Sequence, residues 1–112
     1  MENVKQVVFV SSLHNFAMRN TGEYKIDLEV SEKEFPNVIP IVKYILKPIV
    51  LTMKVDKTSV VIKNSFLFRF QVNTNGDSRV IFTVSNDDVG NEDLFDLINN
   101  CVNKNIAVIV EG

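Results

Sequence analysis

His14 and Cys101 are the only residues of their kinds in this sequence, and they are the first candidates for chemistry. A general base needs an orienting acid and a cleft, and a cysteine nucleophile needs a base beside it. No sequence neighbour supplies such a pair, and one histidine with one cysteine cannot form a zinc set at familiar spacing. We therefore expect His14 to fill a core-facing strand position and Cys101 to be buried and inert. The prediction is a protein that is not an enzyme and uses no metal or cofactor; an enzyme built around His14 is the alternative.

A second candidate is the acid-rich stretch between residues 86 and 96. Its glycine and glutamate are not spaced as in the calcium loop of an EF-hand, so we expect no metal site. A solvated loop and helix start, stabilised by the helix dipole, is the simplest interpretation. The alternative is a partner-binding face for a basic protein surface, as in an inhibitor of a host protein. The acidic residues concerned are Asp87, Asp88, Glu92, Asp93 and Asp96.

The basic residues are scattered, and the net charge of −2 excludes a basic field over the whole molecule. The four glycines are isolated, so no glycine-rich loop could cradle a phosphate. Lys33, Lys43 and Lys47 lie along the first helical segment and are the candidate nucleic-acid contacts. Single-strand binding usually adds exposed aromatic side chains. Only Tyr24 and Tyr44 are amphipathic aromatics, and most phenylalanines are expected in the core, so nucleic-acid binding stays open beside a mixed, solvated surface.

Two strands carry an excess of apolar residues. Val7–Val10 and a segment near the end of the sequence have no polar side. Such strands are buried on both faces, or they present an apolar edge or face to a partner. We predict a homodimer or larger ring, joined through the later strand or through Val7–Val10 and the open face of the sheet. In the later strand, one set of alternate residues would pack under the helices and the other would meet a second copy. The residues expected to mediate self-association are Ile106, Ala107, Val108, Ile109 and Val110.

The elements that must position these residues repeat along the chain. Asn20-Thr21-Gly22-Glu23 precedes Thr74-Asn75-Gly76-Asp77 by 54 residues, and each turn has a glycine where a hairpin needs positive φ. Apolar strand positions follow at the same offset, and three extra residues in the second helix align the last strands. We therefore predict internal repeats over residues 4–55 and 58–111. The expected strands are Lys5–Val10, Leu13–Arg19, Tyr24–Val30, Ile49–Val55, Ser59–Lys63, Phe66–Asn73, Arg79–Val84 and Ile106–Glu111.

Alternation along the strands predicts which side chains are buried. In the strand from Phe66 to Asn73, alternate residues would face the core and solvent in turn. The expected core set is Phe66, Phe68, Phe70 and Val72, and the opposite set is Leu67, Arg69, Gln71 and Asn73. Helices are expected within Glu32–Leu46 and from Glu92 to Val102. Since proline breaks a helix interior, the first should be one short turn followed by a restart near Pro40.

These elements predict one α+β domain over residues 1–112. It would have two layers, with eight strands in two βββαβ units, two helices on one face and an internal pseudo-twofold. A single cysteine fits a reducing compartment, and no apolar run reaches the ~18–20 residues of a membrane helix. We therefore expect a cytoplasmic protein without a membrane partner.

The element order resembles a DNA sliding-clamp domain, which contains two βαβββ units. Starting at Tyr24, the expected elements run strand, helix and three strands, and then begin again at Arg79, as in a circularly permuted clamp domain. Clamp helices carry Lys and Arg toward DNA, whereas the second helix here carries Glu92, Asp93 and Asp96. The composition is also similar to that of small accessory proteins of bacteriophages. The expected function is a non-enzymatic binding and assembly module in phage or mobile-element DNA transactions, acting through protein contacts, with a clamp-like nucleic-acid binder as the alternative.

Overall fold

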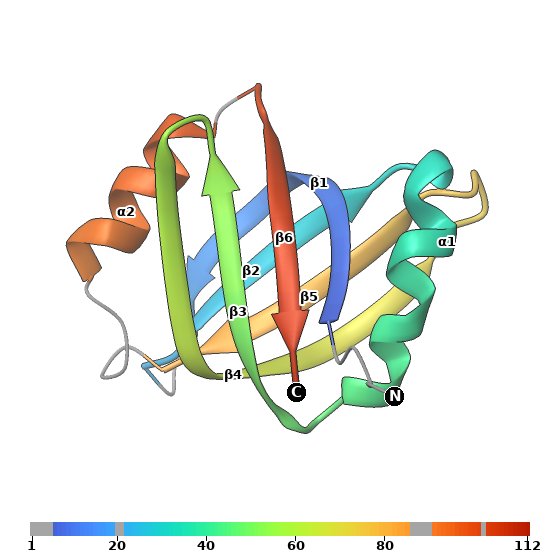
Figure 1. Cartoon of the computed structure of the whole chain (residues 1–112), viewed down its shortest axis with the longest axis horizontal. Coiled ribbons are helices and arrows are strands. Elements are labelled where there is room, and N and C mark those ends of the chain that lie inside the picture. Colours follow the sequence, from blue (N-terminus) through green and yellow to red (C-terminus); the bar gives the residue numbers. More distant parts are fainter. Residues whose placement is uncertain (1–5, 20–21, 86–90, 102) are drawn as a thin grey trace.

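The protein is a closed antiparallel β-barrel flanked by two helical segments (Figure 1). The computed structural model describes residues 6–19, 22–85, 91–101 and 103–112. Hydrogen-bonded neighbours run in the order β1-β2-β5-β4-β3-β6, and β6 pairs with β1 to close the barrel. The strands are β1 (Gln6–Met18), β2 (Tyr24–Val30), β3 (Pro48–Val55), β4 (Thr58–Val72), β5 (Ser78–Val84) and β6 (Asn105–Glu111).

The prediction of a two-layer domain with eight strands is wrong, because two pairs of expected strands are continuous. Lys5–Val10 and Leu13–Arg19 fall in β1, and Ser59–Lys63 and Phe66–Asn73 fall in β4. Both strands bend instead of ending. The first part of β1 pairs with β6 and its second part with β2, while β4 pairs first with β3 and then with β5. The eight-strand order that suggested a sliding clamp is thus replaced by six strands among the described residues.

An irregularity in each long strand accompanies its bend. The register shifts between Leu13 and Asn15 in β1, and between Leu67 and Arg69 in β4. A β-bulge of this kind inserts one residue and increases local twist, which lets one strand serve two sheets. His14 and Phe68 are the inserted residues.

The bulge also overturns the burial expected for β4. Leu67 is fully buried, whereas Phe66 and Phe68 are 38% and 39% exposed. Alternation before the bulge therefore faces opposite to the prediction, and only after it does Phe70 pack against the core. Side chains do not alternate regularly between the two faces of a strand when the strand contains an inserted residue.

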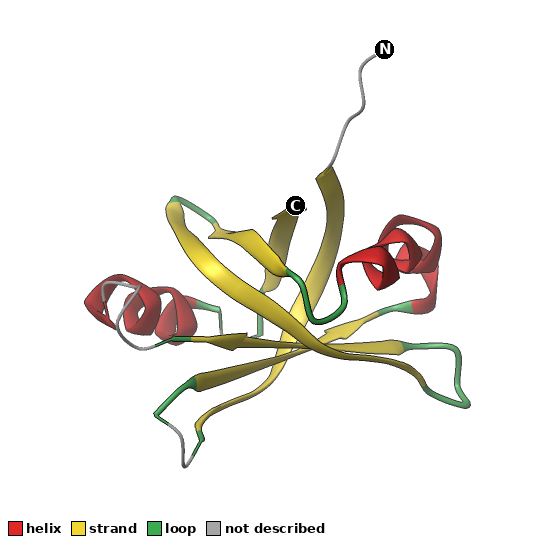
Figure 2. Cartoon of the chain, turned by 90° about the horizontal axis from the view of Figure 1, so that it is seen from below, coloured by secondary structure: helices red, strands yellow, loops and turns green. Residues whose placement is uncertain are grey.

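The helical segments lie on opposite sides of the barrel, not on one face as predicted (Figures 1 and 2). The first comprises a 3-10 turn η1 (Glu32–Glu34), α1 (Phe35–Val38) and a 3-10 helix η2 (Ile39–Tyr44). Pro40 lies in the first turn of η2, which confirms the predicted restart. The second helix is α2 (Asn91–Asn100). The helical segments bury Val38, Ile41, Tyr44, Leu94 and Leu97 in the core.

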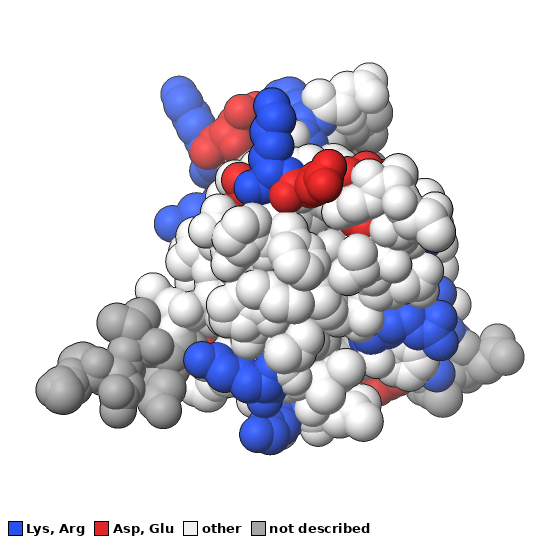
Figure 3. Space-filling view, turned by 90° about the vertical axis from the view of Figure 1, so that its right-hand side faces the viewer, with Lys and Arg blue, Asp and Glu red and all other residues white. Residues whose placement is uncertain are grey.

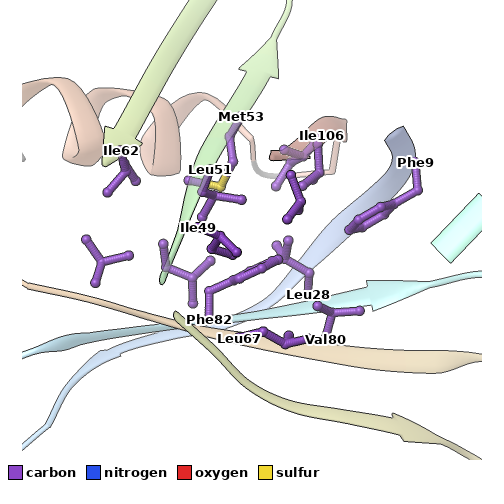
Figure 4. Close-up of a cluster of buried hydrophobic side chains, with 14 of the residues drawn as sticks. Phe9, Leu28, Ile49, Leu51, Met53, Ile62, Leu67, Val80, Phe82 and Ile106 are labelled. Atoms are coloured by element: carbon purple, nitrogen blue, oxygen red, sulfur yellow. The ribbon is translucent and has the colours of Figure 1, made fainter. Parts of the chain in front are cut away.

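The sequence of strand, strand, helical segment and strand occurs twice, so each half is ββαβ. The β2–β5 ladder is centred on Asp27 opposite Ile81, which lie 54 residues apart. On the other side of the barrel, Thr52 lies opposite Ile109, 57 residues apart. The interior between these two ladders is filled by fully buried side chains from all six strands, including Phe9, Leu28, Met53 and Phe82 (Figure 4).

Candidate functional site

Within the described parts of the chain, no helix covers the outer face of the sheet formed by β1, β6, β3 and β4, which faces the viewer in Figure 1. The strand expected to mediate self-association lies at its centre. Ile106, Val108 and Val110 point into the barrel and are fully buried. Ala107 and Ile109 alternate with them, point outward and are half-buried. The two parities therefore separate as predicted, although the inner set packs inside a barrel.

A row of uncharged side chains crosses this face through four adjacent strands. Val8 in β1 pairs with Ile109, Ile109 pairs with Thr52, and Thr52 pairs with Val61. Cross-strand partners of this kind have Cβ atoms ~5 Å apart, so the four side chains adjoin. The two end positions, Val8 and Val61, are 53% and 56% exposed. We call these four residues the valine row.

Charged side chains lie on both sides of the valine row, Lys54 on one side and Glu111 with Lys63 on the other. Lys54 is paired with Ala107 on one side. Glu111 is paired with Val50 on the other, where it accepts a hydrogen bond of 3.1 Å from the Gln6 amide. β6 is hydrogen-bonded to β1 and β3, so it has no free edge and only its face can meet a partner.

The predicted nucleic-acid contacts separate into two places. Lys43 and Lys47 line a hollow of about 520 Å³ together with Tyr44, Pro48 and Gly112, and the Lys43 ammonium lies 5.4 Å from the centre of the Tyr44 ring. Lys33 instead lines a different recess, beside Glu29 and Glu34. A smaller hollow shares Pro48 and Gly112 with the first and adds Lys63, which sequence reasoning did not select.

Charge is unevenly distributed on the side of the molecule that carries α1 and η2 (Figure 3). Acidic and basic side chains are intermingled at the upper margin of that view, the middle is uncharged, and the lower half carries mainly basic side chains. The exposed apolar residues of this helical segment and its C-terminal end are Ile39, Val42, Ile45 and Leu46. Acidic side chains therefore accompany the basic ones at the upper margin, whereas the lower half of this side is mainly basic.

One exposed phenylalanine, Phe66, adjoins the lysine-lined hollow, and a second, Phe68, lies two positions further along β4. Phe66 pairs with Pro48, which lines that hollow. The Arg19 guanidinium lies 5.0 Å from the centre of the Phe68 ring, and that of Arg69 lies 6.0 Å from it. Sequence reasoning missed these aromatics because the alternation placed them in the core. The apolar Leu67 between them was the signal that the opposite set of residues could face the core instead.

A buried ion pair is the second feature that the sequence did not reveal. Asp27 alternates along β2 with the buried Ile26 and Leu28, yet it is itself only 3% exposed. The Arg79 guanidinium donates two hydrogen bonds to it, Nε to Oδ1 at 3.0 Å and Nη2 to Oδ2 at 2.7 Å. This hydrogen bonding to Asp27 raises the pKa of Arg79 above its ordinary value. The pair compensates the only buried carboxylate among the described residues.

The acid-rich stretch is only partly described. Asp87 and Asp88 lie outside the described residues. Glu92 and Asp93 belong to α2, and Asp96 is exposed one turn further along that helix. The partner-binding role predicted for this stretch stays a prediction.

His14 and Cys101 occupy different environments. His14 is exposed at the β1 bulge, with Nδ1 3.9 Å from Glu29 Oε1, so the core position expected for it is wrong. The burial predicted for Cys101 is confirmed: its thiol donates to the Ile98 carbonyl oxygen at 3.0 Å, and desolvation raises its pKa. In the described parts of the chain, no three His, Cys, Asp or Glu side chains gather closely enough to hold a metal ion.

No helix within the described ranges is long and apolar enough to cross a membrane. No protein-family model matches the sequence, and a search of curated proteins finds no match. Function is therefore inferred from the surfaces of the molecule.

Proposed function

We propose that this protein is a non-enzymatic binding and assembly module whose copies pair through the outer face of the β1–β6–β3–β4 sheet. The observation that supports this proposal is the valine row. Antiparallel strands usually turn a polar side to water, whereas here four adjacent strands contribute uncharged, mainly apolar side chains at one level. Contiguous apolar surface of this kind marks an interaction site.

The charges beside the valine row favour a second copy as the partner. In a twofold pairing each copy uses the same surface. If the twofold axis runs along the row, the Lys54 side of one copy faces the Glu111 side of the other, and the reverse holds at the same time. Lys54 of each copy would then lie opposite the side of the other that carries Glu111 and Lys63, so charged side chains would border one apolar centre and Glu111 would offer Lys54 an opposite charge.

The proposal is tested by measuring molar mass with light scattering after gel filtration, at protein concentrations from about 1 to about 100 µM. The native chain should shift toward the mass of a dimer as concentration rises. Ile109→Lys should remain a monomer throughout, because pairing would bury its ammonium in an apolar contact. Val8→Lys should act in the same way at a more exposed position.

Gln71→Lys is the matched control, because Gln71 is an exposed strand residue that pairs with β5 on the other sheet. It should assemble like the native chain. A native chain that stays monomeric at the highest concentration would overturn the proposal. So would Ile109→Lys and Val8→Lys variants that fold, as judged by circular dichroism, and still dimerise.

A further inference from the structure

We propose that the surface around Phe66 and Phe68 binds single-stranded nucleic acid. This surface comprises the two phenylalanines with the flanking Arg19 and Arg69, and the adjoining hollows lined by Lys43, Lys47 and Lys63. Part of it lies on β3 and β4 of the same sheet, but it shares no residue with the valine row, so the proposal goes beyond self-assembly.

The exposed rings supply the first part of the argument. Phe66 and Phe68 each keep more than a third of their surface in solvent, although the barrel has a fully formed core. Both lie on the outside of β4, because the buried Ser65 and Leu67 alternate with them. Nucleobases stack on exposed aromatic faces, and this contact tolerates any base. Phe66 is therefore suited to stack on unpaired bases, whose faces are free, whereas Phe68 already has the Arg19 guanidinium over its ring.

The lysines supply the second part. Lys43 and Lys47 share one hollow, and Lys63 lines the hollow next to it across Pro48 and Gly112. None of these three ammonium groups forms an ion pair within the described part of the chain. Uncompensated cations along a groove attract a phosphate backbone and release its counterions.

The arrangement of rings and cations supplies the third part. Pro48 lines both hollows and is the cross-strand partner of Phe66, so the phosphate-binding and base-stacking groups adjoin. On the other side, Arg19 and Arg69 lie against Phe68. Arg19 is also paired with Glu23 at 3.3 Å, so Arg69 is the stronger phosphate contact of the two. A strand could place its backbone over the lysines, stack a base on Phe66 and continue past the guanidiniums beside Phe68.

The direct test uses fluorescence anisotropy with a labelled oligothymidylate of about 15 nucleotides. Binding should be measurable, with a Kd of about 1–100 µM at low salt, and should weaken steeply between about 50 and about 200 mM salt. Phe66→Leu keeps an apolar side chain without a π-face and should weaken binding about fivefold or more. Lys47→Gln should reduce the salt slope by about one unit.

Lys57→Gln is the control for charge, since Lys57 lies in the β3–β4 turn at the other end of β3. It should leave the affinity and the salt slope nearly unchanged. Polyglutamate and a duplex of the same length separate single-strand recognition from general attraction to anions. Both should bind at least fivefold more weakly than the oligothymidylate, because neither offers free base faces.

A tryptophan reporter tests stacking independently, because the sequence contains no tryptophan. Fluorescence of a Phe66→Trp variant should be quenched by the oligothymidylate. Phe95→Trp is the matched control: Phe95 lies on α2 and is 40% exposed, close to the 38% of Phe66, but it packs edge-on against Tyr24. Its fluorescence should not change.

Three results would each overturn the proposal: no oligothymidylate binding at about 50 mM salt, equal binding of polyglutamate or duplex, or binding that folded Phe66→Leu leaves unchanged. Equal quenching of the two tryptophan variants would also contradict stacking at Phe66.

Discussion

Leu67 and Phe68 are neighbours in β4. Replacing the smaller side chain, Leu67, with alanine should cost more stability than replacing the larger one, Phe68. A phenylalanine usually loses more stability than a leucine when it is replaced by alanine. Here Leu67 is fully buried and Phe68 is 39% exposed. We therefore predict that Leu67→Ala costs more than Phe68→Ala, which reverses the order expected from side-chain size and from simple alternation.

The magnitudes follow from burial. Leu67→Ala removes three buried carbon groups at about 0.8 kcal/mol each, and an unfilled cavity raises the total to about 3–4 kcal/mol. Phe68→Ala removes a ring whose apolar surface is only partly shielded, together with its contact to Arg19. We expect a cost of about 1–2 kcal/mol for this change.

Urea unfolding at one low protein concentration measures both changes without a contribution from assembly. With a slope of about 1.5 kcal/mol per molar urea, the midpoint should fall by about 2–2.7 M for Leu67→Ala and by about 0.7–1.3 M for Phe68→Ala. The slopes themselves should stay close to the native value. A larger loss for Phe68→Ala would place Phe68 in the core and refute the outward phase on which the nucleic-acid surface depends.

Three further predictions concern buried polar groups. Arg79→Met should destabilise the protein more than Asp27→Asn, because only the first leaves a buried carboxylate without its guanidinium; equal losses in thermal unfolding would contradict this. The Cys101 thiol should react with a disulfide reagent at a rate that rises with urea, and rapid labelling in native buffer would show that it is accessible. Burial raises the pKa of Cys101, so the unfolded chain loses the thiol proton first and stability should fall as pH rises above about 8.5. Cys101→Ala should abolish that alkaline loss, and an identical pH profile in both proteins would refute its assignment to the thiol.

Local features of this fold could be predicted from the sequence because they depend on neighbouring residues. Gly22 and Gly76 have φ of +90° and +95°, as the turn sequences indicated. The restart at Pro40 follows from the missing amide hydrogen of proline. The two parities of Ile106–Val110 also separate as alternation predicts.

Features that depend on distant partners could not be predicted in this way. Closure of the barrel joins β1 to β6, and nothing near either strand specifies that pairing. The inserted His14 and Phe68 reverse the phase of their strands without a glycine or proline to mark the change. Asp27 has the alternation of a solvent-exposed residue, and only its contact with Arg79 across the β2–β5 ladder explains its burial.

The same closure constrains the order in which the chain can fold. Among the described residues, the first part of β1 has only β6 as its ladder partner, and the pair Gln6–Glu111 is separated by 105 positions in sequence. Hairpins such as β3–β4 can form as soon as both strands have left the ribosome, because few residues separate them. Val7 and Phe9 instead reach their buried positions only after β6 has been synthesised. During synthesis this apolar segment is therefore exposed for longer than any other core strand, and a chaperone would meet it first.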